Sequence, residues 1–397
     1  MKAAEGSTSG ERLLDIEKQQ APRWAAERFA SGRAEPPVAA AVGRPVLENS
    51  LSILNRTGAW HIAKDLCREF VPEHARVRYW RLGAIAPEGL ARKIAARLMM
   101  LEINWLKDSR CCLIGSKAAD PNTRVFLDPL FVLRSELAEK DIVLCHDVGP
   151  LSHSFLYDAV TVENYRVAYE KIRRCRPGIV FVSDWSKDNF VSIFGLQFRF
   201  LTTIPLYVRT GLFTGPLEAL PGIDSPFFLT VGAFETRKNQ NAALEAYRDG
   251  GFYEQGIKYV LCGPRGDGRD KIIALANSIP GVVMPGYVPD SQLRWLYAHA
   301  EAFVLPSLLE GFGMPALEAA HMGLLPIVSE DSALVEAVEG VCAQVAPKDT
   351  VAIRQAMRCA FLRSPAEKAQ ASRELRDVAG RASKQRFLQG WRSLLLG

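Results

Sequence analysis

Short apolar runs alternate with amphipathic stretches throughout the second half of the chain. The runs are PFFLTVG (226–232), IKYVLCG (257–263), GVVMPG (281–286), AFVLP (302–306), LLPIVS (324–329) and CAQVA (342–346). Apolar runs of this length are typical of strands, and the helical patterns between them indicate crossover connections. The alternation therefore predicts an open, parallel α/β sheet with right-handed crossovers.

The first half shows the same rhythm less regularly. Its candidate strands are ARVRYWRL (75–82), DIVLCHD (141–147), GIVFVS (178–183) and FRFLTTIP (198–205). Because 397 residues exceed the size of one ordinary hydrophobic core, we predict a second α/β sheet. A linker rich in Pro and Gly, without clear periodicity, joins the two. A ligand of such a pair binds at the carboxyl ends of the strands, in the cleft between the domains.

The N-terminal segment and the composition narrow the class of protein. Residues 1–44 are rich in Ala, Glu, Arg, Gly and Pro, which predicts a mobile or loosely docked extension with a short helix near Leu13–Phe29. We find no signal-peptide core, no apolar run of about 18 residues, and no zinc or C-x-x-C spacing among the eight cysteines. These features predict a cytoplasmic protein with reduced thiols. The net charge of +5, without a basic run interleaved with aromatics, argues against a nucleic-acid partner.

The segment TVGAFETRKNQ leads from a predicted strand through a turn into a predicted helix. Arg237 and Lys238 stand at or just before the first turn of that helix. Cations are unfavourable at a helix N-terminus, so an anionic partner would explain the pair. A phosphate fits, because arginine can bind it with two N–H groups and lysine adds a point charge. A solvated basic pair on a surface turn explains the two residues equally well.

A second motif, LPSLLEGFGMPALEAAHMG, places two carboxylates around a turn broken by glycines. Pro315 suits the first helical position, and we expect Glu318 in the first turn, where a carboxylate complements the helix dipole. That account leaves Glu310 and the pair Gly311 and Gly313 unexplained. Glycines let a ligand approach the backbone closely, and a carboxylate on each side can accept hydrogen bonds from two sets of sugar hydroxyls. The motif therefore predicts a nucleotide-sugar site.

These motifs resemble the nucleotide-sugar domain of family 4 glycosyltransferases, which have the GT-B fold. The resemblance is carried by RKN after VGAFET, by GYVPDSQLRWLYAHA, and by the E-x7-E pattern of Glu310 and Glu318. It covers residues 226 to about 345, and LNRTGAWHIAKDL, LCHDVGPLSHS and VSDWSKDNFVSIFG follow in the family's order in the first half. It implies an α/β protein of GT-B type, with two Rossmann-like, doubly wound domains that face a central cleft.

The resemblance also implies a division of the chain. The segments are the N-terminal extension (1–44), an acceptor-binding domain (45–205), a linker (206–225), a nucleotide-sugar-binding domain (226–378) and an amphipathic C-terminal helix (379–397). In proteins of this fold the last helix crosses back to the first domain, and we expect the same here.

The family's site residues can be placed on this sequence. Arg237 and Lys238 would hold the diphosphate. Glu318 would bind the ribose hydroxyls, and Glu310 would face the donor sugar. His146 directly follows a strand and matches the family's histidine beside the donor sugar, although a strand-end histidine bonded to the backbone is the alternative. The other binding residues would be Gly58 at the phosphates, Ser183 at the cleft, Val288 and Asp290 at the base, and the backbone N–H groups of Gly311, Phe312 and Gly313.

One segment departs from the family pattern. The family often shows TGIGRY or a similar sequence after the first strand, whereas this chain has TGAWHIAKD and lacks the second glycine. How closely Gly58 approaches the phosphates therefore stays open.

The resemblance implies a retaining hexosyltransferase that needs no metal and no cofactor other than its nucleotide-sugar co-substrate. The sequence has no Asp-x-Asp motif, which agrees with this. Arg237, Lys238 and helix N–H groups would neutralise the leaving phosphate, which would itself help to deprotonate the acceptor. Similarity to bacterial mannosyltransferases of exopolysaccharide and O-antigen synthesis favours GDP-mannose as the donor, with a UDP-hexose second. The acceptor would be a saccharide or a lipid-linked saccharide.

Two other classes of protein have to be weighed. A glycosidase or phosphorylase would use paired carboxylates but would not need the basic pair beside a nucleotide pocket. The other class is a non-catalytic nucleotide-sugar-binding protein. The intact set of His146, Arg237, Lys238, Glu310 and Glu318 counts against it. Turnover of the donor separates these classes.

An apolar stripe at helical spacing lies between residues 89 and 107. Its members are Leu90, Ile94, Leu98, Leu101 and Trp105. Lys93 and Arg97 flank the stripe, as expected for a helix that lies on anionic lipid at the inner face of the cytoplasmic membrane. The alternative is that the stripe packs on the N-terminal sheet and the basic side is solvated. For a single helix this packing is the more common explanation.

Overall fold

Two parallel sheets form the framework of the protein. The computed structural model describes residues 41–54, 58–105, 121–133 and 135–397. The first sheet has the strand order β2-β1-β3-β4-β5-β6, and all its neighbouring strands are parallel. Its strands are β1 (Val46–Glu48), β2 (Arg76–Arg78), β3 (Arg124–Phe126), β4 (Ile142–Cys145), β5 (Gly178–Phe181) and β6 (Phe200–Thr203).

The second sheet has the order β12-β11-β10-β7-β8-β9 and is also parallel throughout. Its strands are β7 (Phe227–Val231), β8 (Lys258–Cys262), β9 (Val282–Gly286), β10 (Ala302–Leu305), β11 (Pro326–Ser329) and β12 (Ala343–Val345). Each apolar run of the second half contains one of these strands. The predicted α/β class with two open parallel sheets is confirmed.

The first sheet contains two strands that the sequence pattern does not predict, β1 and β3, and the predicted strand 75–82 is reduced to β2. Both missed strands are three residues long, and each contains a buried charged residue, Glu48 or Arg124. Arg124 is neutralised by Asp141, whose Oδ2 lies 2.9 Å from its Nη2. A buried ion pair interrupts the continuous apolar run by which a strand covered on both faces is recognised.

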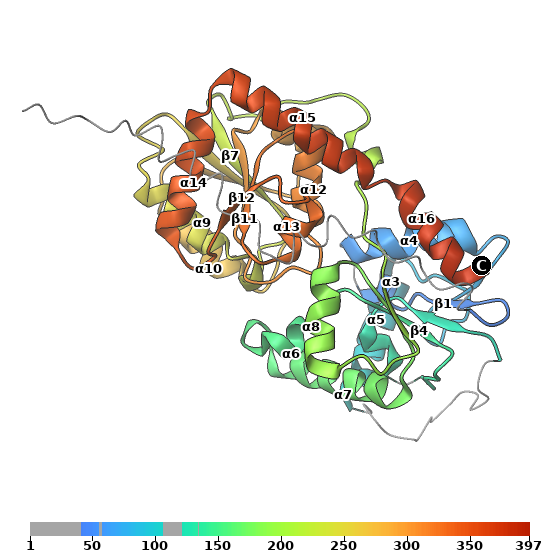
Figure 1. The fold of residues 1–397 in the computed structure, drawn as a ribbon. Helices are drawn as coiled ribbons and strands as arrows, with labels where there is room; N and C mark the ends of the chain where they lie inside the picture. The colour runs from blue at the N-terminus through green and yellow to red at the C-terminus, as the bar shows by residue number, and fades with distance from the viewer. Residues whose placement is uncertain (1–40, 55–57, 106–120, 134) are drawn as a thin grey trace, which may run out of the picture. The chain divides into compact units, whose positions relative to one another are not determined.

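Helices connect the strands (Figure 1). In the first half they are α3 (Leu51–Leu54), α4 (Gly58–Phe70), α5 (Gly89–Trp105), α6 (Gly149–Ser152), α7 (Ala159–Cys175) and α8 (Asp184–Phe194), with 3₁₀ turns η1 (Pro129–Val132) and η2 (Ser154–Leu156). The linker contains η3 (Thr210–Phe213). In the second half they are η4 (Thr236–Lys238), α9 (Gln240–Asp249), α10 (Arg269–Asn277), α11 (Asp290–His299), α12 (Met314–His321), α13 (Ala333–Ala337), α14 (Thr350–Leu362), α15 (Pro365–Arg381) and α16 (Lys384–Leu396).

The second sheet is buried on both faces. Phe228 and Leu261 belong to a cluster with residues of α9, α10 and α14 on one face. The neighbouring Leu229 belongs to the cluster that contains residues of α11, α12 and α15 on the other face. Successive residues of a strand point to opposite faces, so a sheet covered twice needs apolar residues at every position.

The strand order of each sheet reverses once. The reversals lie between β1 and β3 in the first sheet and between β10 and β7 in the second. Ligands of open α/β sheets bind at such a reversal, beyond the carboxyl ends of the strands. The segments that follow β7 and β10 contain Arg237, Lys238 and Glu310. The topology therefore brings the predicted residues to this position although they are far apart in sequence.

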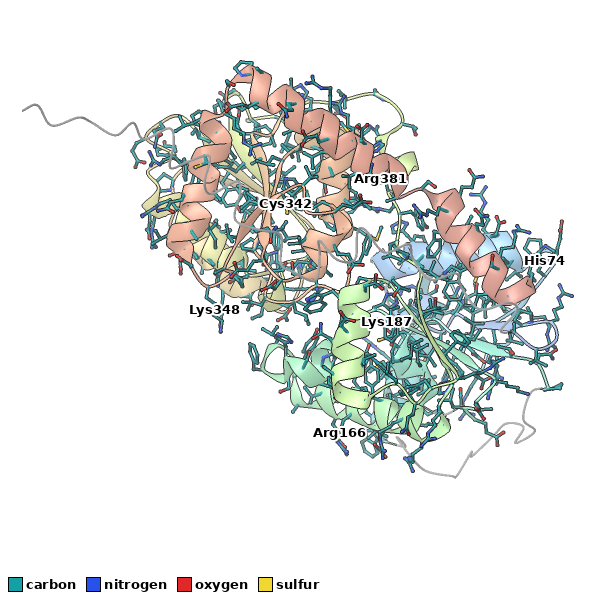
Figure 2. The ribbon with its side chains drawn as sticks, viewed as in Figure 1. His74, Arg166, Lys187, Cys342, Lys348 and Arg381 are labelled. Atoms are coloured by element: carbon teal, nitrogen blue, oxygen red, sulfur yellow. The ribbon has the colours of Figure 1, made fainter. Side chains whose placement is uncertain are left out.

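Of the last two helices, α15 contacts the layers around the second sheet, and α16 contacts the helices around the first sheet. Figure 2 shows Arg381 at the end of α15, where its Nη2 lies 2.6 Å from Glu339 Oε2. Helix α16 lies beside α4 (Figure 1), and its Lys384 Nζ lies 2.6 Å from Asp65 Oδ1. Trp391 of α16 is completely buried. All described residues fall within a single compact unit.

Helix α5 contains the predicted helix up to Trp105, while residues 106 and 107 lie outside the described residues. It packs inward through Ala95, Met99 and Ile103. The apolar stripe is on the other side, and its members are between 51% and 82% exposed. The expectation that the stripe packs inward on the first sheet is wrong, because the residues on the opposite side of the helix fill that role.

The predicted helix near Leu13–Phe29 also lies outside the described residues. Within the part of the chain that the structure describes, no helix is both long enough and apolar enough to span a bilayer.

Candidate functional site

Two cations and two carboxylates meet where the second sheet reverses. Lys238 Nζ lies 2.6 Å from Glu310 Oε1, and Arg237 Nη1 lies 3.1 Å from Glu310 Oε2. Arg237 Nη2 also lies 2.8 Å from Glu235 Oε2. Lys238 is only 6% exposed, so a solvated surface pair is the wrong description of it. We call these four residues the charged cluster.

Glu310 is ionised in the charged cluster. Its burial opposes ionisation, but Lys238 and Arg237 outweigh this and lower the pKa of Glu310 to about 2. Burial likewise opposes the charge of Arg237, whereas Glu310 and Glu235 raise the pKa of the guanidinium. At neutral pH Glu310 therefore accepts hydrogen bonds and has no proton to donate.

We expect Glu310 to make the stability of the protein depend on pH. Its folded pKa of about 2 lies below the ordinary 4.5, so its contribution is complete above pH 4.5 and is lost as the pH falls toward 2. The full contribution is about 3 kcal/mol, of which about 1 kcal/mol is lost by pH 3.5. Urea unfolding at pH 6 and pH 3.5 measures it. The wild type should lose about 1 kcal/mol more than Glu310→Gln, and parallel losses would contradict the prediction.

The glycine turn after Glu310 lies against the first sheet. A Cβ on Gly311 would lie 2.3 Å from the carbonyl oxygen of His146. Ser183 Oγ donates to Gly311 O at 2.6 Å, and Ser186 Oγ contacts both Gly311 O and His146 O. We predicted that glycine would leave room for a ligand. The structure shows a second reason, which is the close approach of backbone from the other sheet.

The helix that follows the turn begins one residue earlier than predicted. Gly313 has φ +100° and precedes Met314, the first residue of α12. Pro315 is the second residue of the helix and not the first as predicted, although a proline without an N–H is still tolerated there. Glu318 is the fifth residue and lies beyond the first turn, so the dipole explanation of this carboxylate is wrong. Phe312 is buried between the glycines.

Glu318 is held by two residues that the motif does not contain. Arg209 Nε and Nη2 lie 2.7 Å and 2.6 Å from Glu318 Oε1. Tyr297 donates its hydroxyl to Oε2 at 3.1 Å. Burial raises the pKa of Glu318, and the bonds to Arg209 and Tyr297 partly offset this. Only 1% of Glu318 is exposed, which distinguishes it from a carboxylate open to ligands.

His146 directly follows β4, and its backbone carbonyl oxygen lies beside Gly311 of the glycine turn. Its Nε2 is 3.1 Å from the carbonyl oxygen of Leu127. A carbonyl oxygen only accepts, so Nε2 is the donor and a neutral His146 presents Nδ1 as an acceptor. His146 thus makes the hydrogen bond to the backbone that the alternative explanation predicted. This bond fixes the orientation of the ring.

The remaining predicted residues take different positions. Gly58 begins α4, and a Cβ there would lie 3.3 Å from Met314 Sδ, so the N-terminal ends of α4 and α12 are close together. Val288 is buried, while Asp290 is exposed at the first residue of α11. Ser183 is buried and caps α8. The structure therefore joins Ser183 to the glycine turn and leaves Asp290 accessible.

Sequence analysis did not single out Arg209, Tyr297 or Glu235. Arg209 lies in the aperiodic linker, 109 residues before Glu318, so no local pattern relates the two. Tyr297 has the helical spacing of an ordinary core residue. Glu235 could have been found, because it lies two positions before Arg237 and a carboxylate there balances a cation.

The charged cluster does not have the composition of a metal site. Among the described residues, no group of three or more His, Cys, Asp or Glu side chains is arranged to hold a metal ion. The positive charges in the cluster belong to lysine and arginine side chains.

Comparison with known proteins relates the second sheet to one family. Residues 220–358 match the family model of glycosyl transferases group 1. O-antigen chain mannosyltransferase B of Escherichia coli is 32% identical over 187 residues, which cover 44% of this chain and 49% of that protein. Serotype-specific mannosyltransferase WbdA of Escherichia coli is 34% identical over 243 residues, which cover 56% of this chain and 29% of that protein. The chain thus spans half or less of the length of these relatives.

A solved structure gives the fold. Anabaena Alr3699/HepE, crystallised in complex with UDP and glucose, superposes with a TM-score of 0.61 over 88% of this chain and 100% of that chain, at 15% identity. An identity this low relates the folds alone. The matched family range contains Arg237, Lys238, Glu310 and Glu318. The chain thus has the GT-B fold, matches the model of glycosyl transferases group 1 over residues 220–358, and resembles bacterial mannosyltransferases.

Proposed function

We propose that this protein is a retaining glycosyltransferase. It transfers mannose from GDP-mannose to a hydroxyl of a saccharide acceptor, and in the cell this acceptor is linked to a lipid. The group 1 domain supports the reaction class. The names of the curated relatives support the choice of hexose, since both are mannosyltransferases, and the O-antigen chain in one name supports the acceptor class.

The charged cluster is the observation that carries the proposal. It lies at the strand reversal, where open α/β sheets bind ligands. Lysine has three N–H donors and arginine has five, so Lys238 and Arg237 can hold Glu310 and a phosphate at the same time. In a site shielded from water, such fixed donors stabilise the charge that develops on a departing diphosphate.

The chemistry follows from these roles. The bond between the anomeric carbon and the β-phosphate oxygen breaks, and the acceptor oxygen bonds to the same face of the sugar. The acceptor proton passes to the departing phosphate. Glu310 is ionised and positions the donor and the two cations, while His146 Nδ1 accepts a hydrogen bond from the sugar. We propose that Lys238 and Arg237 supply the positive charge without a metal ion, so transfer should persist in EDTA.

The first experiment compares donors. Calorimetric titration with GDP and UDP gives the nucleotide preference, and incubation with GDP-mannose and methyl α-D-mannopyranoside tests transfer. We expect preferential binding of GDP and release of GDP with formation of a disaccharide that retains the anomeric configuration. Preference for UDP would replace the donor by a UDP-hexose. Binding of GDP without turnover of GDP-mannose would favour a non-catalytic binding protein.

We further propose that α5 brings the protein to the cytoplasmic face of a membrane, where a lipid-linked acceptor would lie. The exposed apolar stripe would enter the lipid, and the exposed Lys93 and Arg97 match the charge of anionic head groups. Ile85, in the loop before α5, is 75% exposed and adds to the apolar surface.

Co-sedimentation with phosphatidylglycerol vesicles tests this contact. Charge reversal in Lys93→Glu/Arg97→Glu should reduce vesicle binding about tenfold or more, because each basic residue near an anionic surface contributes about 1 kcal/mol. Leu90→Ser should also weaken binding. Leu362→Ser on α14 is the matched control, since Leu362 is 70% and Leu90 is 73% exposed. Equal binding by all variants would contradict the proposal.

A further inference from the structure

A residue of the linker closes off Glu318. Arg209 precedes η3, and its guanidinium lies on Glu318 Oε1 through Nε and Nη2. The side chain of Arg209 is 28% exposed and that of Glu318 only 2%. Arg209 therefore forms the outer layer of this ion pair, and Glu318 lies beneath it.

The carboxylate has too few acceptor positions for both Arg209 and a ribose. An ionised carboxylate offers about four lone-pair positions. Arg209 covers Oε1, because its Nε donates a hydrogen bond to that atom at 2.7 Å and its Nη2 forms an ion pair with it at 2.6 Å. The hydroxyl of Tyr297 occupies one position on Oε2. The two adjacent hydroxyls of a ribose would need two acceptors where one is left. A ribose can bind Glu318 only after Arg209 has moved.

The same guanidinium reaches the first sheet. Arg209 Nη1 lies 3.4 Å from Nε2 of His61 on α4. Burial and the charge of Arg209 lower the pKa of His61, so its neutral ring can accept a hydrogen bond from the guanidinium. Arg209 thus connects α12 with α4 from the segment that links the two sheets.

We infer that Arg209 is a latch, which binds Glu318 in the nucleotide-free protein and is displaced by the ribose hydroxyls of the donor. The inference rests on the proposed function and adds a regulation of that site. Asp290, exposed at the start of α11, contributes to the negative charge around Arg209 and offers the released guanidinium a partner. Displacement also removes the link to His61, so nucleotide binding changes the contact between the two sheets.

Calorimetry with GDP and with 2′,3′-dideoxy-GDP tests the latch on wild type, Arg209→Ala and Arg209→Gln. Removing a competitor for Glu318 should tighten GDP binding by Arg209→Ala about tenfold, because a hydrogen-bonded charge pair is exchanged. Arg209→Gln keeps a neutral donor and should show a smaller gain. Neither variant should gain affinity for the dideoxy analogue, which has no hydroxyls to place on Glu318.

Arg381→Ala is the matched control, because it removes an exposed ion pair with Glu339 and should leave GDP affinity unchanged. Unchanged or weaker GDP binding by folded Arg209→Ala would overturn the latch and make Arg209 a residue that orients Glu318. An equal gain for the dideoxy analogue would also overturn it. Either result leaves the proposed function intact, whereas binding of neither GDP nor UDP by any of these proteins would overturn the donor site itself. Arg209→Gln provides the comparison if Arg209→Ala does not fold.

Discussion

Lys238→Ala is expected to lower kcat for mannosyl transfer by a factor on the order of 10² to 10³, the loss that follows removal of one preorganised donor from a charge-stabilising site. Lys238 Nζ lies 2.6 Å from Glu310 Oε1 inside the charged cluster. The variant removes one of two cations that would face the diphosphate. Steady-state kinetics with GDP-mannose, at a temperature where circular dichroism shows folded protein, measure the effect.

The same change is expected to reduce the free energy of unfolding. It leaves the buried Glu310 with Arg237 alone, and breaking a buried ion pair costs about 3 kcal/mol or somewhat more. Lys258→Ala is the control, since Lys258 pairs with Asp224 at 2.5 Å on the surface and should change neither activity nor stability appreciably. Full activity in folded Lys238→Ala would refute the assigned role.

Gly311→Ala is expected to lower kcat/KM on the order of 10²-fold and to destabilise the protein by about 1 to 3 kcal/mol. The new Cβ would lie 2.3 Å from the carbonyl oxygen of His146, which is about 1 Å closer than ordinary contact. The turn that follows Glu310 must then move away from the loop of the first sheet. Kinetics and urea unfolding of the variant measure both effects.

A glycine elsewhere gives the control for this substitution. Gly380 on α15 has open space around the position of a Cβ, and alanine favours helices, so Gly380→Ala should leave activity unchanged. Wild-type activity in Gly311→Ala would show that the close approach of the two loops is not needed for transfer. Glycine is the smallest residue, so no smaller side chain can restore activity at position 311. The comparison of Gly311→Ala with Gly380→Ala therefore decides the question.

The local sequence predicted the second sheet better than the first. Strands β7 to β12 are continuous apolar runs because they are covered on both faces. Strands β1 and β3 contain Glu48 and Arg124, whose burial depends on partners elsewhere in the fold. A pattern of single residues cannot show that a charge will be neutralised after folding.

Only part of the charged cluster followed from the sequence. The motifs identified Arg237, Lys238 and Glu310, and the position of strand ends explains why they share one edge of the sheet. The contacts among these three residues were not predicted. The motifs had suggested a phosphate as the partner of the cations and a sugar as the partner of the carboxylate. The structure shows that the opposite charges also hold one another.

The α/β class, the second sheet and the residue types at its strand reversal follow from the local sequence, since apolar periodicity and turn residues act over short distances. Only the folded structure shows which side of α5 is buried, why Gly311 must be glycine, and that Arg209 covers Glu318. These features depend on contacts between residues that are distant in the chain. Their energies depend on burial and geometry, which arise only when both sheets have formed.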